Sequence, residues 1–196
     1  MGRPSRRGEI LEIGVDMLHR KGFTATSVDS ITVAAGVPKG AFFNHFGSKE
    51  AFAVEALRRY FERWEDKIAP LADDATAPVI GRIRALIAAA CRSDDATIGV
   101  GCMLGNLSGE LGRDEGQITK TISGIFVNWE RHFQILIDEG QKTGQLNASV
   151  PSSQAARLIV NGMQGALLRS KVDHNSVALK DLDTMIGLVL GVPPNN

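Results

Sequence analysis

The sequence lacks the features that mark secreted, membrane and metal-binding proteins. Its two cysteines, Cys91 and Cys102, are too few for a disulfide framework and have no neighbouring histidines that would suggest zinc. No apolar run is long enough to span a bilayer, and the basic start of the chain has no apolar signal segment. We therefore expect a cytoplasmic protein with reduced cysteines, no bound metal and no membrane partner.

The chain also lacks the residue patterns on which many enzymes depend. It contains no phosphate-binding glycine loop, no H-E-x-x-H and no G-x-S-x-G. The glycine pairs between Gly99 and Gly105 do not follow a strand, so a dinucleotide-binding fingerprint is not expected. The histidines are scattered singly, at His19, His45, His132 and His174. We predict that the protein is not an enzyme and has neither catalytic residues nor a cofactor.

Charge is balanced over the whole chain but not along it. The 22 basic residues equal the 22 acidic ones, which argues against a protein that coats nucleic acid with its entire surface. The first 59 residues nevertheless hold nine Lys or Arg against six acids, so this end is positive by three. The asymmetry fits a small phosphate-facing head on a neutral-to-acidic body, although scattered surface charge also gives such a count.

The most informative stretch, residues 24–52, has the pattern of a helix-turn-helix. Ser27 can cap a first short helix in which apolar residues recur at helical spacing. Gly36 stands where a helix ends in a left-handed residue, and Pro38 suits the first turn of a second helix. The connection between the two helices is too short for anything but a bend.

The second helix combines small, basic and hydrogen-bonding side chains with two aromatic ones, namely Lys39, Gly40, Phe42, Phe43, Asn44 and His45. A helix of this kind can enter the major groove of DNA. After it, Ser48 can cap a third helix, and Lys49 lies beside an N-terminus whose peptide dipole attracts anions. We therefore predict a phosphate contact near Lys49.

These residues resemble the N-terminal pattern of the TetR family of one-component bacterial transcriptional regulators. The match consists of Gly22-Phe23-Thr24-Ala25-Thr26-Ser27, of Ile31 through Gly40, and of Phe43-Asn44-His45-Phe46 followed by Ser48-Lys49-Glu50. The resemblance is strong over the head and extends to the rest of the chain only through its helical plan. The sequence departs from the family at Phe43, where Tyr is usual, and at Thr32, where alanine is common. Loss of the phenolic hydroxyl removes one phosphate contact and leaves the fold pattern intact.

The resemblance implies the residues that bind DNA. Phosphate contacts are implied for Thr26, Ser27, Phe43, His45 and Lys49. Base contacts are implied for Lys39, Gly40 and Asn44. A bidentate contact of Asn44 with adenine or of Lys39 with guanine would contribute about 1–3 kcal/mol. The family also implies a homodimer whose two heads bind successive major grooves of a near-palindromic operator.

The rest of the chain is predicted to be helical, without repeats or strand-like alternation. Apolar residues at helical spacing continue from residue 48 until Pro70, so one long helix connects the head to the body. Further helices are expected at 78–90, from Gly101 onward, and at 115–143, 154–171 and 179–190. We predict an all-α protein with a helix-turn-helix DNA-binding head at 1–52, a connecting helix that ends near Pro70, and a ligand-binding and dimerisation body at 71–196.

Cys102 allows two interpretations. In one, it is a small buried hydrophobe in a crowded helix. In the other, it is a sensor thiol at a helix N-terminus, where the dipole lowers a thiol pKa and favours attack on electrophiles. The run from Gly101 to Leu107, GCMLGNL, resembles a segment of TetR regulators that control aldehyde, acrylate or electrophile detoxification genes. Both interpretations stay open on the sequence.

The resemblance also implies an effector cavity between the body helices. An aromatic stripe on the 115–143 helix lies near this cavity, although such a stripe is also typical of a core. The candidate ligand contacts are Cys102, Met103, Asn106, Phe126, Trp129, His132, Phe133, Met163 and Gln164. The last two helices carry more apolar surface than a monomer can easily hide, which is typical of the family's four-helix dimer interface.

We therefore predict a homodimeric repressor that a small-molecule effector releases from operator DNA. In a variant of this prediction, an electrophile alkylates or oxidises Cys102 and so provides the signal. Two alternatives are an activator of the same architecture and a helical small-molecule-binding module that does not bind DNA.

Overall fold

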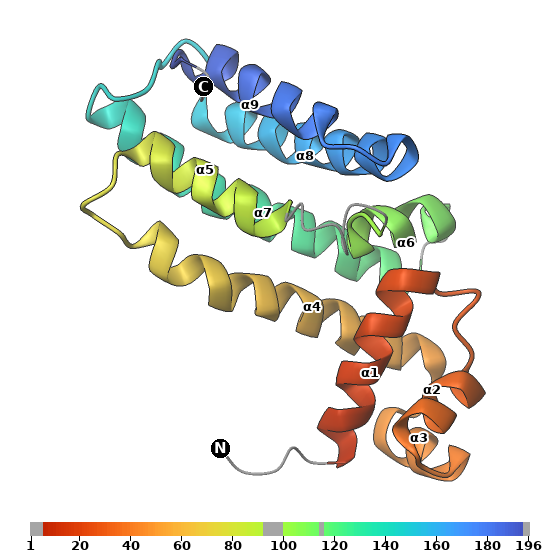
Figure 1. Ribbon diagram of the computed structural model, residues 1–196. Helices are drawn as coiled ribbons and strands as arrows, with labels where there is room; N and C mark the ends of the chain where they lie inside the picture. The colour runs from red at the N-terminus through yellow and green to blue at the C-terminus, as the bar shows by residue number, and fades with distance from the viewer. Residues whose placement is uncertain (1–5, 92–99, 114–115, 194–196) are drawn as a thin grey trace. The chain divides into compact units, whose positions relative to one another are not determined.

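The computed structural model describes residues 6–91, 100–113 and 116–193 (Figure 1). These residues form nine α-helices and contain no strand, so the all-α prediction is confirmed. The helices are α1 Arg6–Lys21, α2 Val28–Ala35, α3 Lys39–Phe46, α4 Lys49–Ala72, α5 Val79–Ala90, α6 Met103–Leu111, α7 Gln117–Lys142, α8 Ser152–Asp173 and α9 Val177–Leu190.

The chain divides into two compact units, which we call the head unit and the body unit. The head unit combines Met1–Glu62 with Met103–Gly124, and the body unit combines Arg63–Cys102 with Ile125–Asn196. The helix-turn-helix thus shares a unit with α6 and the first residues of α7. This division is not the single cut near Pro70 that the sequence suggests, because α4 and α7 each contribute to both units.

The core of the head unit surrounds Phe52, which is fully buried. The rings of Phe42 and Phe46 lie against it, with centroids 5.0 and 4.8 Å from the Phe52 centroid. Gly14 of α1 faces the same ring, since a Cβ at this position would lie 2.0 Å from Phe52 Cζ. Glycine therefore lets α1 approach α4 closely, and the aromatic rings hold α3 against this pair.

Local capping residues determine where the head helices begin and end. Ser27 Oγ accepts a hydrogen bond from the Ser30 amide at 3.0 Å, and Ser30 Oγ accepts one from the Ser27 amide at 3.1 Å, which is a capping box. Gly36 ends α2 with a φ of 61°, a conformation that glycine adopts without strain. Ser48 Oγ accepts a hydrogen bond from the Ala51 amide at 3.0 Å at the start of α4. The three caps that the sequence predicts are confirmed.

In the body unit, α8 and α9 lie side by side (Figure 1). Gly162 of α8 makes this packing possible, because a Cβ there would lie 2.7 Å from Met185 Cε. The Arg84 guanidinium of α5 binds the Asp183 carboxylate of α9 at 2.7 Å and so ties a third helix to the pair. The absence of a side chain at Gly162 thus leaves room for the Met185 side chain between the two helices.

The connecting helix continues past its predicted end. α4 runs through Pro70 to Ala72. A proline this close to a helix end removes one backbone hydrogen bond without stopping the last turn. The Asp73 amide still donates to the Ala69 carbonyl at 3.1 Å, which closes the helix.

Later helices begin near the predicted positions. α6 begins at Met103, so Cys102 precedes the helix instead of lying inside it. α9 begins at Val177, before the predicted residue 179, because Asn175 Oδ1 accepts a hydrogen bond from the Val177 amide at 3.0 Å. The predicted start of α7 at residue 115 lies outside the described residues.

Candidate nucleic-acid interface

The α3 helix has one buried face and one exposed face. Phe42 and Phe46 lie four positions apart and are buried in the core of the head unit. The predicted DNA-binding residues of this helix are exposed, namely Lys39, Gly40, Phe43, Asn44 and His45. Burial of the two phenylalanines thus turns the polar face of α3 outward, as a recognition helix requires.

Gly40 lies on the exposed face of α3 and is not required by the packing of the protein. A Cβ at this position would meet nothing within 4 Å. Gly40 is the second residue of α3, where alanine favours a helix more than glycine does, so packing among the described residues does not require a glycine here. The space above Gly40 is open for another molecule to approach the helix backbone.

Lys39 forms an ion pair across the helix-turn-helix. Its Nζ lies 2.8 Å from Asp29 Oδ1, at the first turn of α2. The two side chains are 56% and 68% exposed, so water screens the pair and a nucleic acid can compete for the lysine. The pair therefore holds Lys39 near the start of α3 without making it unavailable.

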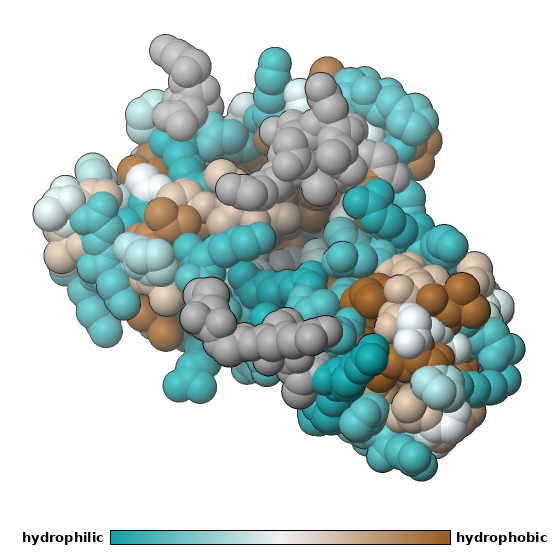
Figure 2. Space-filling view, turned by 60° about the horizontal axis from the view of Figure 1, so that its bottom comes forward, coloured by the Kyte–Doolittle hydropathy of each residue, from teal (hydrophilic) through white to brown (hydrophobic). Residues whose placement is uncertain are grey.

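Apolar surface accompanies these polar residues. Figure 2 shows brown, hydrophobic atoms gathered among hydrophilic ones at the lower right, on the part of the chain that carries the helix-turn-helix. Among the described residues of the head unit, the exposed large apolar side chains are Val33, at 81%, and Phe43, at 42%. Such side chains can contact thymine methyl groups or sugars in a DNA groove.

Three of the predicted phosphate-binding residues, Thr26, Ser27 and Lys49, lie outside α3. Ser27 is exposed at the N-terminus of α2. Lys49 begins α4, with its Nζ 4.2 Å from the centroid of the Phe23 ring. Thr26 differs from both, because its side chain is fully buried and its hydroxyl donates to the Gly22 carbonyl at 2.7 Å. Its side chain therefore stabilises the turn between α1 and α2, and the phosphate contact of Thr26 stays a prediction.

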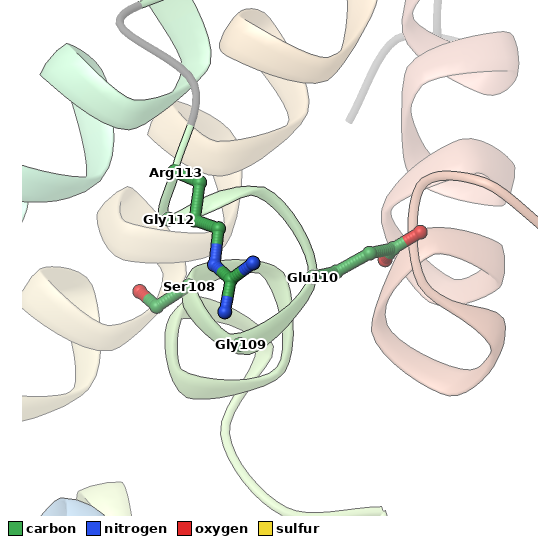
Figure 3. Close-up of a pocket in the computed structure, with 5 residues that line it drawn as sticks. All are labelled: Ser108, Gly109, Glu110, Gly112 and Arg113. Carbon is green, nitrogen blue, oxygen red and sulfur yellow. The ribbon is translucent and has the colours of Figure 1, made fainter.

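Glu110 of α6 is a contact residue of the head unit that the sequence analysis missed. Its Oε2 accepts a hydrogen bond from the Phe23 amide at 2.9 Å, and its Oε1 accepts one from the Thr24 amide at 2.5 Å. The partners lie 87 and 86 positions away and are backbone groups, so no sequence pattern reveals the contact. Figure 3 shows the Glu110 side chain extending from α6 toward α1 and the turn that follows it.

The electrostatic surroundings of Glu110 favour its charged form. Partial burial alone raises the pKa of this carboxyl. Hydrogen bonds from Thr24 and Phe23, together with the charge of Lys49, act in the opposite direction and bring its pKa below the ordinary value. Glu110 is therefore an ionised acceptor at neutral pH.

In the body unit, the structure brings together two of the predicted effector contacts. The side-chain amide of Gln164 on α8 donates to Cys102 Sγ at 3.6 Å. Cys102 is 6% exposed, and the neighbouring Met163 is fully buried. Burial, with a smaller contribution from Cys102, raises the pKa of Cys91 to about 12. Cys91 is thus a neutral thiol at physiological pH. Of the two cysteines, Cys102 is the one whose sulfur accepts the Gln164 hydrogen bond.

Three more predicted effector contacts lie in an aromatic cluster of the body unit. The Trp64 ring of α4 meets the rings of Trp129 and His132 edge-on, with centroid distances of 5.4 Å in both cases. The Phe126 ring lies 6.3 Å from that of Trp129. His132 Nε2 lies 3.1 Å from Glu65 Oε1. The sequence analysis did not include Trp64 and Glu65, which come from the connecting helix.

The remaining predicted effector contacts, Phe133, Met103 and Asn106, belong to neither of these two groups. Phe133 is fully buried on α7. Met103 is fully buried in the head unit, and the side-chain amide of Asn106 donates to the His19 carbonyl there at 3.4 Å. An open hollow of about 480 Å³ at the end of α6 has none of the predicted contacts among its described lining residues, which are Ser108, Gly109, Glu110, Gly112 and Arg113 (Figure 3).

Comparison with known proteins identifies the family. The family model described as "Bacterial regulatory proteins, tetR family" matches residues 10–56, which contain the helix-turn-helix. The model described as "Tetracyclin repressor-like, C-terminal domain" matches residues 79–186, more than half of the chain. The chain belongs to the TetR family. As a TetR-family protein it is a DNA-binding transcriptional regulator, and its matched N-terminal segment contains α2 and α3.

Two curated transcriptional regulators resemble the chain over most of its length. The HTH-type transcriptional repressor DhaR of Mycobacterium sp. is 34% identical over 186 residues, which cover 95% of this chain and 92% of DhaR. The transcriptional regulator AcuR of Cereibacter sphaeroides is 32% identical over 169 residues, which cover 84% of this chain and 75% of AcuR.

Solved structures of TetR regulators share the fold. A regulatory protein TetR from Rhodobacter sphaeroides is 26% identical, has a TM-score of 0.85, and is matched over 93% of this chain and 97% of its own. The reduced form of Escherichia coli NemR has a TM-score of 0.86 at 23% identity, with 97% and 99% of the two chains covered, and supports the fold alone.

Metal-binding clusters and membrane spans are both absent from the described part of this TetR-family chain. Within residues 6–91, 100–113 and 116–193, no three His, Cys, Asp or Glu side chains come together in a way that could hold a metal ion. No helix in these ranges is long and apolar enough to cross a membrane.

Proposed function

We propose that this protein is a homodimeric repressor that binds operator DNA through α3 and is released by a small-molecule effector. The observation that carries the proposal is the exposed polar face of α3, which results from burial of Phe42 and Phe46. Lys39 and Asn44 on that face match guanine and adenine in the major groove, at about 1–3 kcal/mol for each good bidentate contact. Relatives named as repressors, DhaR among them, favour repression over activation.

Exposed apolar residues on the last two helices support a dimer. Large side chains of α8 and α9 are exposed in the single chain, namely Leu158, Leu168, Val172, Val177 and Leu188. One head offers only a few base contacts, so a specific affinity requires two heads held together. Two copies of the α8–α9 pair would form a four-helix interface and cover this apolar surface.

We place the effector in the body unit, beside Cys102 and Gln164. The buried Cys102 sulfur and the half-buried Gln164 amide of α8 offer a polar contact next to the fully buried Met163 position. The effector acts by a population shift. It must bind more tightly to the conformation whose head spacing does not fit the operator than to the conformation whose head spacing fits. A nearly complete switch requires a preference of about 10⁴-fold.

A combined binding and expression experiment tests this proposal. Purified protein is titrated with duplexes from the DNA upstream of its own gene, with and without candidate aldehydes and quinones, and expression of the neighbouring genes is compared in a deletion strain. A repressor binds one duplex specifically, loses it on addition of an effector, and its deletion raises expression. Lower expression after deletion would identify an activator, and absence of specific binding would leave a helical binding module.

The hydrogen bond between Gln164 and Cys102 favours a second, covalent form of the same proposal. The Gln164 amide holds the Cys102 sulfur, which is the atom that would attack an electrophile, in a fixed place beside α8. With an α,β-unsaturated carbonyl, the Cys102 sulfur forms a bond to the β-carbon and the thiol proton ends on the α-carbon, so no oxidant is needed. Cys102→Ser should then bind operator and fail to respond, while Cys91→Ser keeps the response. A fully responsive Cys102→Ser protein would leave only non-covalent binding.

A further inference from the structure

We infer that Glu110 is a positioning residue for operator binding, which holds the turn between α1 and α2 through hydrogen bonds to the Phe23 and Thr24 amides. The two carboxylate oxygens accept one bond each, at 2.9 and 2.5 Å. A carboxylate that accepts two amide hydrogen bonds fixes both the position and the orientation of the peptide. The inference concerns DNA binding alone and does not depend on an effector.

A second contact directs the same face of α6 to the end of α1. Asn106 lies four positions before Glu110, so both side chains project from one side of the helix. The side-chain amide of Asn106 donates to the His19 carbonyl at 3.4 Å, in the last turn of α1. α6 therefore contacts the chain both where α1 ends and where the turn begins.

Gly22 provides the room that Glu110 requires. Its φ of 80° lies in the left-handed region, and a Cβ at this position would lie 2.6 Å from Glu110 Oε2. Any other residue at position 22 would be strained and would displace the carboxylate from the Phe23 amide. The absence of a side chain at Gly22 thus leaves the space that the Glu110 carboxylate occupies.

The turn held by Glu110 leads directly to residues that face DNA. Ser27, the N-cap of α2, lies three residues after Thr24. Lys49 contacts the same turn, with its Nζ 4.2 Å from the centroid of the Phe23 ring. Phe23 is therefore held at its amide by Glu110 and at its ring by Lys49. A displaced turn moves the start of α2 and removes the ring on which Lys49 rests.

Two possible roles of Glu110 predict opposite effects of its neutralisation on the affinity for operator DNA. Glu110 interacts electrostatically with Lys49. If Glu110 acted only as a negative charge, its neutralisation would strengthen binding to every DNA, because phosphates repel it. If it positions the turn, neutralisation weakens specific binding and leaves non-specific binding unchanged or tighter.

The test compares Glu110→Gln and Glu110→Ala with Glu130→Gln, which removes the same charge from α7 in the body unit. The full-length proteins are titrated with a duplex that the wild-type protein selects from random sequence, and with an unrelated duplex of equal length. We expect operator affinity to fall about threefold for Glu110→Gln and about tenfold for Glu110→Ala, with no loss on the unrelated duplex. Glu130→Gln should match the wild type.

Two further measurements distinguish a positioning role of Glu110 from a contribution to stability alone. Amide NMR signals of Phe23 and Thr24 should move upfield in Glu110→Gln, because each loses a charged acceptor, while thermal unfolding stays close to wild type. Unchanged or stronger operator binding by both Glu110 variants would overturn the inference. Loss of operator binding in proportion to loss of folded protein would also overturn it, because Glu110 would then serve stability alone.

Discussion

Lys39 Nζ on α3 lies 2.8 Å from Asp29 Oδ1 on α2. The lysine that we expect to contact a base is thus paired with an acid before DNA arrives. An exposed pair of this kind contributes about 0–1 kcal/mol, which is less than a good base contact provides. Operator DNA can therefore displace Asp29, and the acid acts as a competitor for the lysine.

The first prediction concerns the two members of this ion pair. Lys39→Ala should weaken operator binding and relax base preference at one position, by about 1–3 kcal/mol. Asp29→Asn should strengthen binding to operator and to unrelated DNA alike, because it frees Lys39 and removes a negative charge from the interface. Equilibrium titrations at two salt concentrations measure both effects. Asp66→Asn on α4, in the body unit, is the control for loss of one acid, and weaker binding by Asp29→Asn would show that Asp29 orients the lysine.

The second prediction concerns Gly40. Since a Cβ at this position meets none of the described residues within 4 Å, Gly40→Ala should fold normally and lose no stability, because alanine favours a helix more than glycine does. Its operator affinity should nevertheless fall, because the added methyl group keeps α3 away from the groove. Gly124→Ala on α7 is a matched control, since a Cβ there also meets nothing within 4 Å. Operator affinity that stays the same in Gly40→Ala would exclude a close approach of DNA at this point.

The third prediction concerns the contact between Gly14 and Phe52. Gly14→Ala places a methyl group 2.0 Å from the position of Phe52 Cζ, so the ring must move within a filled core. We expect a loss of about 1–3 kcal/mol in the free energy of unfolding, measured by chemical denaturation. A smaller residue at position 52 should reduce the conflict, so Phe52→Leu should cost less in the Gly14→Ala background than in the wild type. Additive costs would contradict the contact.

The fourth prediction concerns the proposed dimer. Leu168 and Leu188 are 63% and 81% exposed on α8 and α9. Changing both to Gln should leave the fold of the chain intact, shift sedimentation toward the monomer, and weaken operator binding. Val33→Gln changes an equally exposed apolar residue of the head unit and should not alter the sedimenting mass. A double variant that sediments as the wild type does would place the interface elsewhere.

The head could be predicted from sequence because its determinants are local. The cap at Ser27 and the left-handed Gly36 lie within a few residues of the groups that they serve, so the sequence contains the complete pattern. The buried face of α3 follows from two phenylalanines at helical spacing. The orientation of Thr26 could not be predicted, because it depends on whether the hydroxyl finds the Gly22 carbonyl or solvent.

Contacts between segments that lie far apart in the sequence could not be predicted from local sequence patterns. Glu110 binds backbone amides, which every residue has, and the pairing depends on how α6 packs in the head unit. The family resemblance named Cys102 and Gln164 as members of one site, but the 3.6 Å contact between them requires the packing of the body unit. Asn106 was assigned to the same site, whereas its amide donates to a carbonyl at the end of α1.

Selection of DNA by the intact protein tests the central claim most directly. The wild-type protein is incubated with random duplexes, the bound fraction is sequenced over several rounds, and Lys39→Ala and Asn44→Ala are treated in parallel. We predict enrichment of a near-palindromic sequence whose half-sites are separated by about one turn of DNA or a multiple of it. The two variants should lose preference at particular positions of each half-site. Absence of an enriched sequence with the wild-type protein, or the same sequence with all three proteins, would contradict the assignment of α3 as the helix that reads the operator.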